Sequence, residues 1–306
     1  MAPERIAVVG APSSAGAYAP GQERAPGALR AAGLLEALVR AGWDEADDAG
    51  DVEGFRWAPD GDDPMAANVA VAAAVAARVA GEVARVLDDG ARRALVLGGD
   101  CTVGVGAVAG AAHRGERVGL VYLDLHADMN VPDATDDGTL DWMGVAHLLA
   151  LDGARAELRD VGLRTPLLQG KDLVLVGFDP DHATAFELAA IAEHDVTVVT
   201  VADLAADPKG AARRALATLA DCDVLSVHLD IDLVDFLELP LSENTERDGG
   251  VTFETALTAL AVLAAHDRTA TVTLTELNPD HGAADGSTMA TFVEGVAAAL
   301  APRNCR

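Results

Sequence analysis

Short apolar runs alternate along this chain with longer segments of helical periodicity. The runs are short enough to be buried strands. They cover residues 6–9, 94–97, 118–123, 173–176, 196–201, 224–229 and 270–274. Strands that alternate with helices are typical of right-handed crossovers and of a mainly parallel sheet covered on both faces. The pattern therefore predicts a doubly wound, three-layer α/β fold, in which function collects at the carboxyl ends of the strands.

The longest stretch of low polarity, residues 65–87, predicts an alanine-rich helix packed on the sheet. Arg78, Glu82 and Arg85 interrupt this stretch, so it does not qualify as a membrane span. A second helix, rich in small residues, is predicted over residues 103–112. We find no linker that would divide the chain, and we expect a single domain over residues 1–306.

Two groups of side chains with metal-ligating chemistry follow the predicted strands 118–123 and 224–229. If the chain stays extended there, alternate side chains share one face and converge. Buried carboxylates without a counter-charge are costly, and a pair of divalent cations would supply that charge. One Asp-x-Asp pair at a strand end is common without a metal, whereas both groups together are far more specific. The side chains are Asp124, His126, Asp128, Asp230 and Asp232.

The chemistry of this ligand set narrows the choice of metal and of reaction. Carboxylate oxygens with a single imidazole are typical ligands of Mn²⁺ or Mg²⁺, whereas a zinc site is often rich in thiolates. Two such cations activate water near neutral pH, which predicts hydrolysis. Cys101, after the predicted strand 94–97, is expected to point into the same cluster, although a lone cysteine near a helix start is often inert filler. Glu276, after strand 270–274, is either a surface acid or a carboxylate that receives a guanidinium group.

Charge and cysteine content exclude several classes of partner. The net charge is −27, from 49 acidic and 22 basic residues, which argues against nucleic acid and anionic membrane as partners. The acidic runs 44–51 and 60–63 are interpreted as loop charge. Cys101, Cys222 and Cys305 form no spaced framework, and the start of the chain lacks an export signal. These features predict a reduced, cytoplasmic setting.

These segments, in this order, resemble the arginase family of metal-dependent ureohydrolases over nearly the whole chain. Residues 8–14 (VVGAPSS) and 25–30 (APGALR) also resemble that family's first strand and helix. The resemblance implies a central parallel sheet of about eight strands, typical of this kind of α/β fold. It also implies a homo-oligomer, a small guanidino amino acid as substrate, and two Mn²⁺ ions per subunit.

The resemblance also assigns roles to individual residues. One metal would take Cys101, Asp124, Asp128 and Asp230, and the other Asp124, His126, Asp230 and Asp232. Catalytic candidates are Asp128, Asp141 and Glu276, the last holding the guanidinium. Asn130 matches the position that receives an α-carboxylate, and either Asp179 or Asp181 matches the one that binds an α-amino group. Further substrate-binding candidates are Asp137, Thr139 and Thr245.

Three departures from the family pattern carry the finer prediction. Cys101 stands where the family has histidine; a thiolate there adds negative charge and suits manganese poorly, so we expect a weak first site. Asp141 stands near the family's proton-transferring histidine, and an acid donates well at neutral pH only if burial raises its pKa. His147 is an alternative proton donor, although its neighbours predict a packed helix. His228 either supports the metal from behind or fills space.

A weaker metal site without the histidine predicts a substrate that needs less activation than arginine. An N-hydroxyguanidine is less basic and easier to attack, and the Gly-Gly-Asp-Cys variant resembles the hydroxyarginine amidinohydrolases of D-cycloserine biosynthesis. We therefore expect hydrolysis of N-omega-hydroxy-L-arginine to L-ornithine and hydroxyurea in antibiotic biosynthesis. The alternatives are an ordinary arginase, an agmatinase-like or formimidoylglutamase-like relative, and a non-catalytic metabolite-binding homologue.

Overall fold

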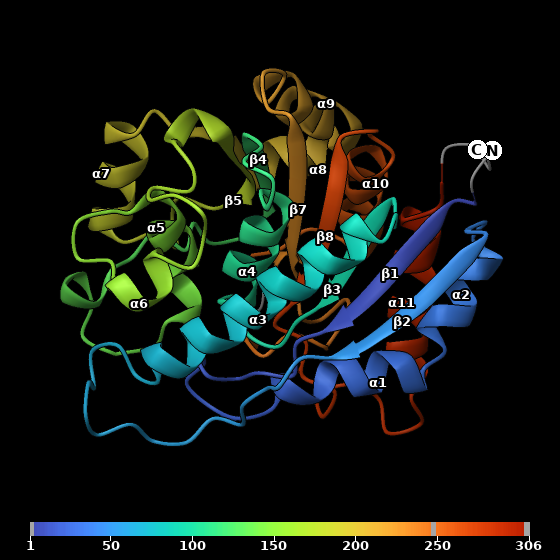
Figure 1. Cartoon of the computed structure of the whole chain (residues 1–306), viewed down its shortest axis with the longest axis horizontal. Helices are drawn as coiled ribbons and strands as arrows, with labels where there is room; N and C mark the ends of the chain where they lie inside the picture. Colours follow the sequence, from blue (N-terminus) through green and yellow to red (C-terminus); the bar gives the residue numbers. More distant parts are fainter. Residues whose placement is uncertain (1–2, 246–248, 303–306) are drawn as a thin grey trace.

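A central parallel sheet lies between two layers of helices in the computed structural model, which describes residues 3–245 and 249–302 (Figure 1). The strand order in this eight-stranded sheet is β2-β1-β3-β8-β7-β4-β5-β6. This arrangement confirms the predicted α/β fold. Cys305 lies outside the described residues. The strands are β1 Arg5–Gly10, β2 Glu45–Asp51, β3 Arg93–Leu97, β4 Val118–Leu123, β5 Leu173–Phe178, β6 Thr197–Thr200, β7 Val224–Asp230 and β8 Thr269–Thr275.

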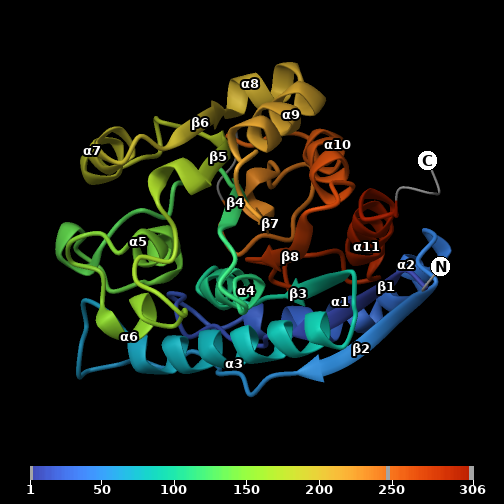
Figure 2. The same ribbon diagram turned by 45° about the horizontal axis from the view of Figure 1, so that its top comes forward.

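Alternate residues of the same strands face two different cores. Leu95 and Leu97 of β3 pack with the layer that holds α1, α2 and α9 to α11, whereas Ala94 and Val96 face α3 and α4. Figure 2 shows α3 and the α8 to α11 group on opposite faces of the sheet. None of the helices in the described part of the chain is long and apolar enough to cross a membrane. The helices are α1 Ala25–Ala31, α2 Leu34–Arg40, α3 Val69–Asp88, α4 Val103–Ala111, α5 Gly144–Leu149, α6 Ala156–Arg159, α7 Ala185–Glu193, α8 Val201–Ala206, α9 Pro208–Thr218, α10 Phe253–Ala264 and α11 Ser287–Ala299.

The edge strand β2 shows that the interpretation of residues 44–51 as loop charge was wrong. Its acidic residues pair in parallel with β1, and two arginines balance them. Arg5 Nη2 lies 2.6 Å from Asp47 Oδ2, and Arg30 Nη1 lies 2.6 Å from Asp51 Oδ1. An edge strand has one neighbour and a solvated surface, so it needs no apolar run, and charge on it discourages pairing between sheets. Hydrophobic patterning therefore could not detect β2.

The long helix α3 begins at Val69, so the prediction of a helix from residue 65 was wrong in its first turn. Asn68 precedes it in a left-handed conformation with φ 59°. The helix α4 packs directly on α3, and Gly106 permits this close approach, since a Cβ there would lie 2.2 Å from Ala76 O. This contact fixes α4, whose start adjoins Cys101, against the sheet.

The strands that carry the four chemical motifs are neighbours in the sheet. The segment β3-β8-β7-β4 is continuous, with Leu97 beside Leu274, Thr275 beside Asp230, and Leu229 beside Leu123. All four strands run in parallel, so their carboxyl ends meet at one edge of the sheet. The fold therefore brings together motifs that lie far apart in the sequence.

Candidate active site

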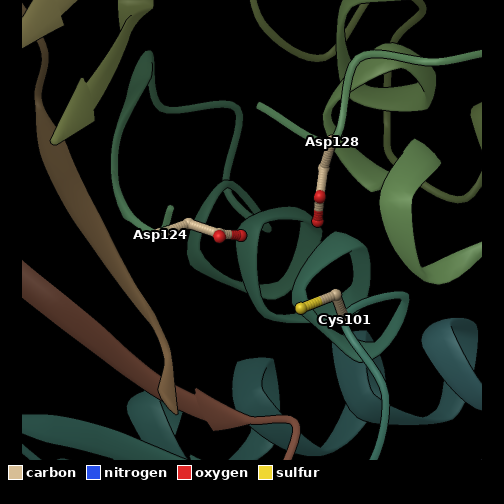
Figure 3. A group of neighbouring side chains, drawn as sticks. All are labelled: Cys101, Asp124 and Asp128. Carbon is tan, nitrogen blue, oxygen red and sulfur yellow. The ribbon is translucent and has the colours of Figure 1, made fainter. Parts of the chain in front are cut away.

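The acidic and thiol side chains at this edge form three overlapping groups. Cys101, Asp124 and Asp128 point toward a common space (Figure 3), and one ligand atom from each lies within 4.8 Å of the others. Asp124 also groups in this way with His126 and Asp232. Both groups fall within the two ligand sets that the resemblance implied. The third group is Cys101, Asp230 and Glu276.

The chain reaches this convergence by bending, so the condition of an extended segment after β4 is not met. The His126 main-chain N–H donates to Asp124 Oδ1 at 2.7 Å, and the Asp232 N–H donates to Asp230 Oδ1 at 2.8 Å. Each aspartate thus forms a local turn with the residue two positions later. Asp128 has φ 51°, a left-handed conformation that few non-glycine residues adopt. Local hydrogen bonds, rather than strand periodicity, aim these side chains.

The cluster holds more negative charge than its protein surroundings balance. Burial, followed by the charge of Asp232, raises the pKa of Asp124 to about 7. Burial, followed by neighbouring aspartates, also raises the pKa values of Asp128 and Asp230 well above their ordinary range. Burial alone would lower the pKa of His126, but the carboxylates of Asp232 and Asp124 raise it. The protein by itself therefore balances the site with protons and one imidazolium.

Two unpaired carboxylate oxygens show that this donor set fits divalent cations. Asp124 Oδ2 and Asp232 Oδ1 are buried and find no hydrogen-bond partner among the residues that the structure describes. Buried carboxylate oxygens normally have such partners, and a cation is the natural substitute. The set contains one imidazole, one thiol and several oxygens. It therefore resembles a Mn²⁺ site more closely than it resembles a thiolate-rich zinc site.

Cys101 lies inside this cluster and is not an inert filler of the core. Its Sγ donates to Asp230 Oδ2 at 2.9 Å and lies 3.2 Å from Thr275 Oγ1. His228 Nε2 contacts the sulfur at 3.3 Å, and the imidazole stacks on Tyr122 with ring centroids 4.3 Å apart. Burial lowers the pKa of His228 to about 3, so the ring is neutral. Among the described residues, His228 therefore contacts the Cys101 thiol on the side away from the pocket. This contact favours a supporting role for His228 over mere space filling.

A pocket of about 270 Å³ opens over the cluster. Its wall contains most of the predicted residues together with three that we did not predict. The unpredicted residues are Tyr18, Trp142 and Asn244. The predicted residues in the wall are Cys101, His126, Asp128, Asp137, Thr139, Asp141, Asp230, Asp232 and Glu276.

Asp141 meets the condition that a proton-donating acid requires. Burial, followed by the charges of Asp100 and Asp128, raises the pKa of Asp141 well above its ordinary value. The alternative donor, His147, is fully buried in α5, where its Nδ1 hydrogen-bonds Met143 O at 2.7 Å and its Nε2 accepts from the Arg155 N–H at 3.1 Å. These bonds confirm the packed-helix interpretation, so His147 is unsuited to proton transfer in the pocket.

Three predicted substrate residues do not form part of the pocket wall as the structure describes it. Asn130 is fully buried, with Oδ1 accepting from Thr184 Oγ1 at 2.7 Å. Asp181 and Thr245 are exposed, and Thr245 adjoins the wall residue Asn244. Their assignment came from position in a family pattern, and it remains a prediction. Asn244 and Trp142 each adjoin a predicted residue, which was the available signal, whereas Tyr18 comes from a distant loop.

Glu276 is held firmly at the base of the site. Its Oε1 accepts from the Cys101 main-chain N–H at 2.8 Å, and its Oε2 accepts from Gln22 Nε2 at 2.9 Å. The residue is only 7% exposed. It is therefore a buried acid facing the pocket, and the surface-acid alternative was wrong.

Comparisons with known proteins agree with this architecture. A profile of the arginase family matches residues 4–301. An arginase of Bacillus caldovelox is 28% identical over 281 residues, covering 90% of this chain and 91% of that protein. Human arginase-1 is 31% identical over a shorter alignment that covers 56% of this chain and 53% of that protein. The Bacillus subtilis arginase structure superposes with a TM-score of 0.84 at 24% identity, covering 97% of this chain and 98% of that one, which supports the fold.

Proposed function

Since the chain belongs to the arginase family of metal-dependent hydrolases that act on guanidino and amidino C–N bonds, we propose that it hydrolyses N-omega-hydroxy-L-arginine to L-ornithine and hydroxyurea. The observation that carries this choice is the Cys101 thiol, which lies 2.9 Å from Asp230 within the ligand cluster. A thiolate ligand is softer and carries more charge than an imidazole, which weakens a manganese site as an electrophile. Such a site favours a guanidine that is easier to attack than arginine.

The proposed metal ligands are Cys101, Asp124, Asp128 and Asp230 for one ion and Asp124, His126, Asp230 and Asp232 for the other. When bound, two divalent cations would lower the pKa of a water molecule and so provide a nucleophile near neutral pH. Asp124 and Asp230 belong to both sets. They are buried at the ends of adjacent strands, so the sheet itself fixes the spacing between the two sets.

Glu276 and Asp141 would act directly on the substrate. Glu276 accepts hydrogen bonds from the hydroxyguanidine group and fixes the face of the carbon that is attacked. Asp141, protonated because burial raises its pKa, donates a proton to the departing ornithine amine. Water supplies the new carbonyl oxygen of hydroxyurea. One of its protons restores Asp141 and the other goes to the hydroxyimino nitrogen, so the reaction balances without another reactant.

The decisive experiment compares hydrolysis of L-arginine and N-omega-hydroxy-L-arginine by wild type and Cys101→His, each with added Mn²⁺. We expect wild type to prefer the hydroxylated substrate, and arginine hydrolysis to rise in the variant together with its manganese content. Cys222→Ala is the matched control, because Cys222 is also buried and has no disulfide, yet it lies outside the pocket wall. A wild-type preference for arginine would instead identify an ordinary arginase activity.

A further inference from the structure

We propose that Gln22 is a positioning residue that orients the Glu276 carboxylate toward the guanidine group of the substrate. The inference rests on the proposed function, because it takes Glu276 as the group that binds the guanidine. Gln22 begins the short 3-10 turn Gln22–Arg24 between β1 and α1. It lies 254 positions from Glu276 in the sequence, and no motif pointed to it.

The contacts of Glu276 carry the proposal. Gln22 is fully buried, and its Nε2 donates to Oε2 of Glu276 at 2.9 Å. The Cys101 N–H holds the other oxygen, Oε1, at 2.8 Å. Glu276 itself has φ 62°, a strained conformation for a residue other than glycine. Two donors from distant parts of the chain therefore fix the plane of a carboxylate that sits on a strained backbone.

Packing alone does not explain an amide at this position. Gln22 Oε1 is buried and has no hydrogen-bond partner within the described residues. An unpaired buried acceptor destabilises a fold, and an apolar side chain of the same length would avoid that cost. Local violations of this kind concentrate at functional positions. The useful half of this amide is its N–H group, and the N–H group contacts Glu276.

The surrounding contacts make Gln22 a rigid support. Gly21 lies so close to the loop after β8 that a Cβ there would stand 2.4 Å from Asn278 Nδ2. Arg24 Nη2 forms an ion pair with Asp280 Oδ2 at 2.5 Å. Asn278 and Asp280 follow Glu276 closely in the chain. The 3-10 turn is therefore fastened to the same loop whose carboxylate Gln22 contacts.

The chemical consequence concerns orientation more than affinity. A carboxylate has about four lone-pair positions, so two donors from the protein leave others for a guanidine. With its plane fixed, Glu276 presents those positions in one direction, and the guanidine carbon meets the nucleophile in one geometry. Loss of the Gln22 donor should leave substrate binding largely intact while the bound guanidine samples unproductive orientations.

The test is Gln22→Met in the full chain with Mn²⁺, because methionine keeps the length and removes the donor. We expect kcat for the preferred guanidine substrate to fall roughly ten-fold or more, as expected for a lost hydrogen bond to a charged group. KM should change less, and Tm should change little, because the variant removes the unpaired Gln22 Oε1 but also takes the donor from Glu276 Oε2. The control is Thr273→Val, which removes another buried, unpaired polar atom, on β8, without touching Glu276. Its kcat should match wild type.

Each other outcome overturns the inference in a recognisable way. A Gln22→Met enzyme with wild-type kcat would show that the amide does not position Glu276. A lowered Tm with kcat restored at a lower temperature would assign Gln22 a merely structural role. Gln22→Leu, which also lacks the donor, repeats the test if the methionine variant folds poorly. If wild type hydrolyses neither arginine nor its N-hydroxy derivative, the proposed function fails, and the role of Gln22 fails with it.

Discussion

Replacing Asp124 by asparagine should stabilise the metal-free protein at alkaline pH. In the folded chain, burial and the charge of Asp232 raise the pKa of Asp124 from 3.8 to about 7. A group whose pKa is raised by folding contributes stability that is fully present below the unfolded pKa and is lost as the pH rises through the folded pKa. Asparagine has the same shape but does not ionise, so the variant keeps this stability at high pH.

The size of the effect follows from the shift. A change of about 3 units, at about 1.36 kcal/mol per unit, corresponds to roughly 4 kcal/mol at most. The variant should therefore exceed wild type by up to roughly 4 kcal/mol at pH 8 and match it near pH 4. In wild type, Asp124 Oδ1 accepts a hydrogen bond from the His126 main-chain N–H at 2.7 Å. The side-chain oxygen of asparagine can accept the same bond, so the local turn should survive.

Urea unfolding of chelator-treated protein at pH 4, 6 and 8, followed by circular dichroism, measures this difference. Added Mn²⁺ should stabilise wild type by mass action and have much less effect on the variant, which lacks a carboxylate of both proposed ligand sets. Asp152→Asn is the control, because it removes the same charge from an exposed position. The reasoning is refuted if metal-free Asp124→Asn is less stable than wild type at pH 8, or if the difference does not depend on pH.

Two further changes test the proton donor and the edge strand. Asp141→Asn should lower kcat by roughly 100-fold, as expected for loss of a general acid, with little change in KM. If Asp141 donates this proton as proposed, wild-type kcat should also fall as the pH rises through the raised pKa of Asp141. An Asp141→Asn variant that keeps the same alkaline decline would contradict this role. Arg30→Met should cost roughly 1 kcal/mol of unfolding free energy, since Arg30 binds Asp48 and Asp51 of β2. The loss, measured in urea, should shrink in high salt, and a salt-independent loss would point to packing instead.

Seven of the eight strands could be predicted from hydrophobic runs. Six of them are buried at nearly every position and therefore need apolar residues, whereas the edge strand β6 carries valines although it is only partly buried. The exception, β2, is stabilised by Arg5 and Arg30, which lie outside it in the sequence. The strand order could not be predicted either, since no local pattern shows that β8 and β7 lie between β3 and β4. That insertion makes the four strands that carry the motifs neighbours, so that their carboxyl ends lie side by side at one edge.

The residues of the candidate site also divide into those that the sequence could predict and those that it could not. Residues at the carboxyl ends of buried strands, such as Asp124 and Asp230, were predictable, because their charge conflicts with the apolar runs before them. Residues that reach the site from loops were not, because Tyr18 and Gln22 carry no local signal and come to the site only through the packing of the segment after β1. The substrate residues transferred by position, such as Asp181, depend on loop conformation, which a family pattern does not specify.

Residue 101 connects the two halves of the site through different atoms. Its sulfur lies in the ligand cluster beside Asp230, while its main-chain N–H holds Glu276. A side-chain substitution at this position therefore changes the chemistry offered to the proposed metal and leaves in place the main-chain donor that holds the Glu276 carboxylate. The proposed metal chemistry can therefore change without disturbing the proposed guanidine site, because Gln22 and the peptide of residue 101 hold Glu276 independently of the thiol. For the same reason, Cys101→His isolates the contribution of the ligand.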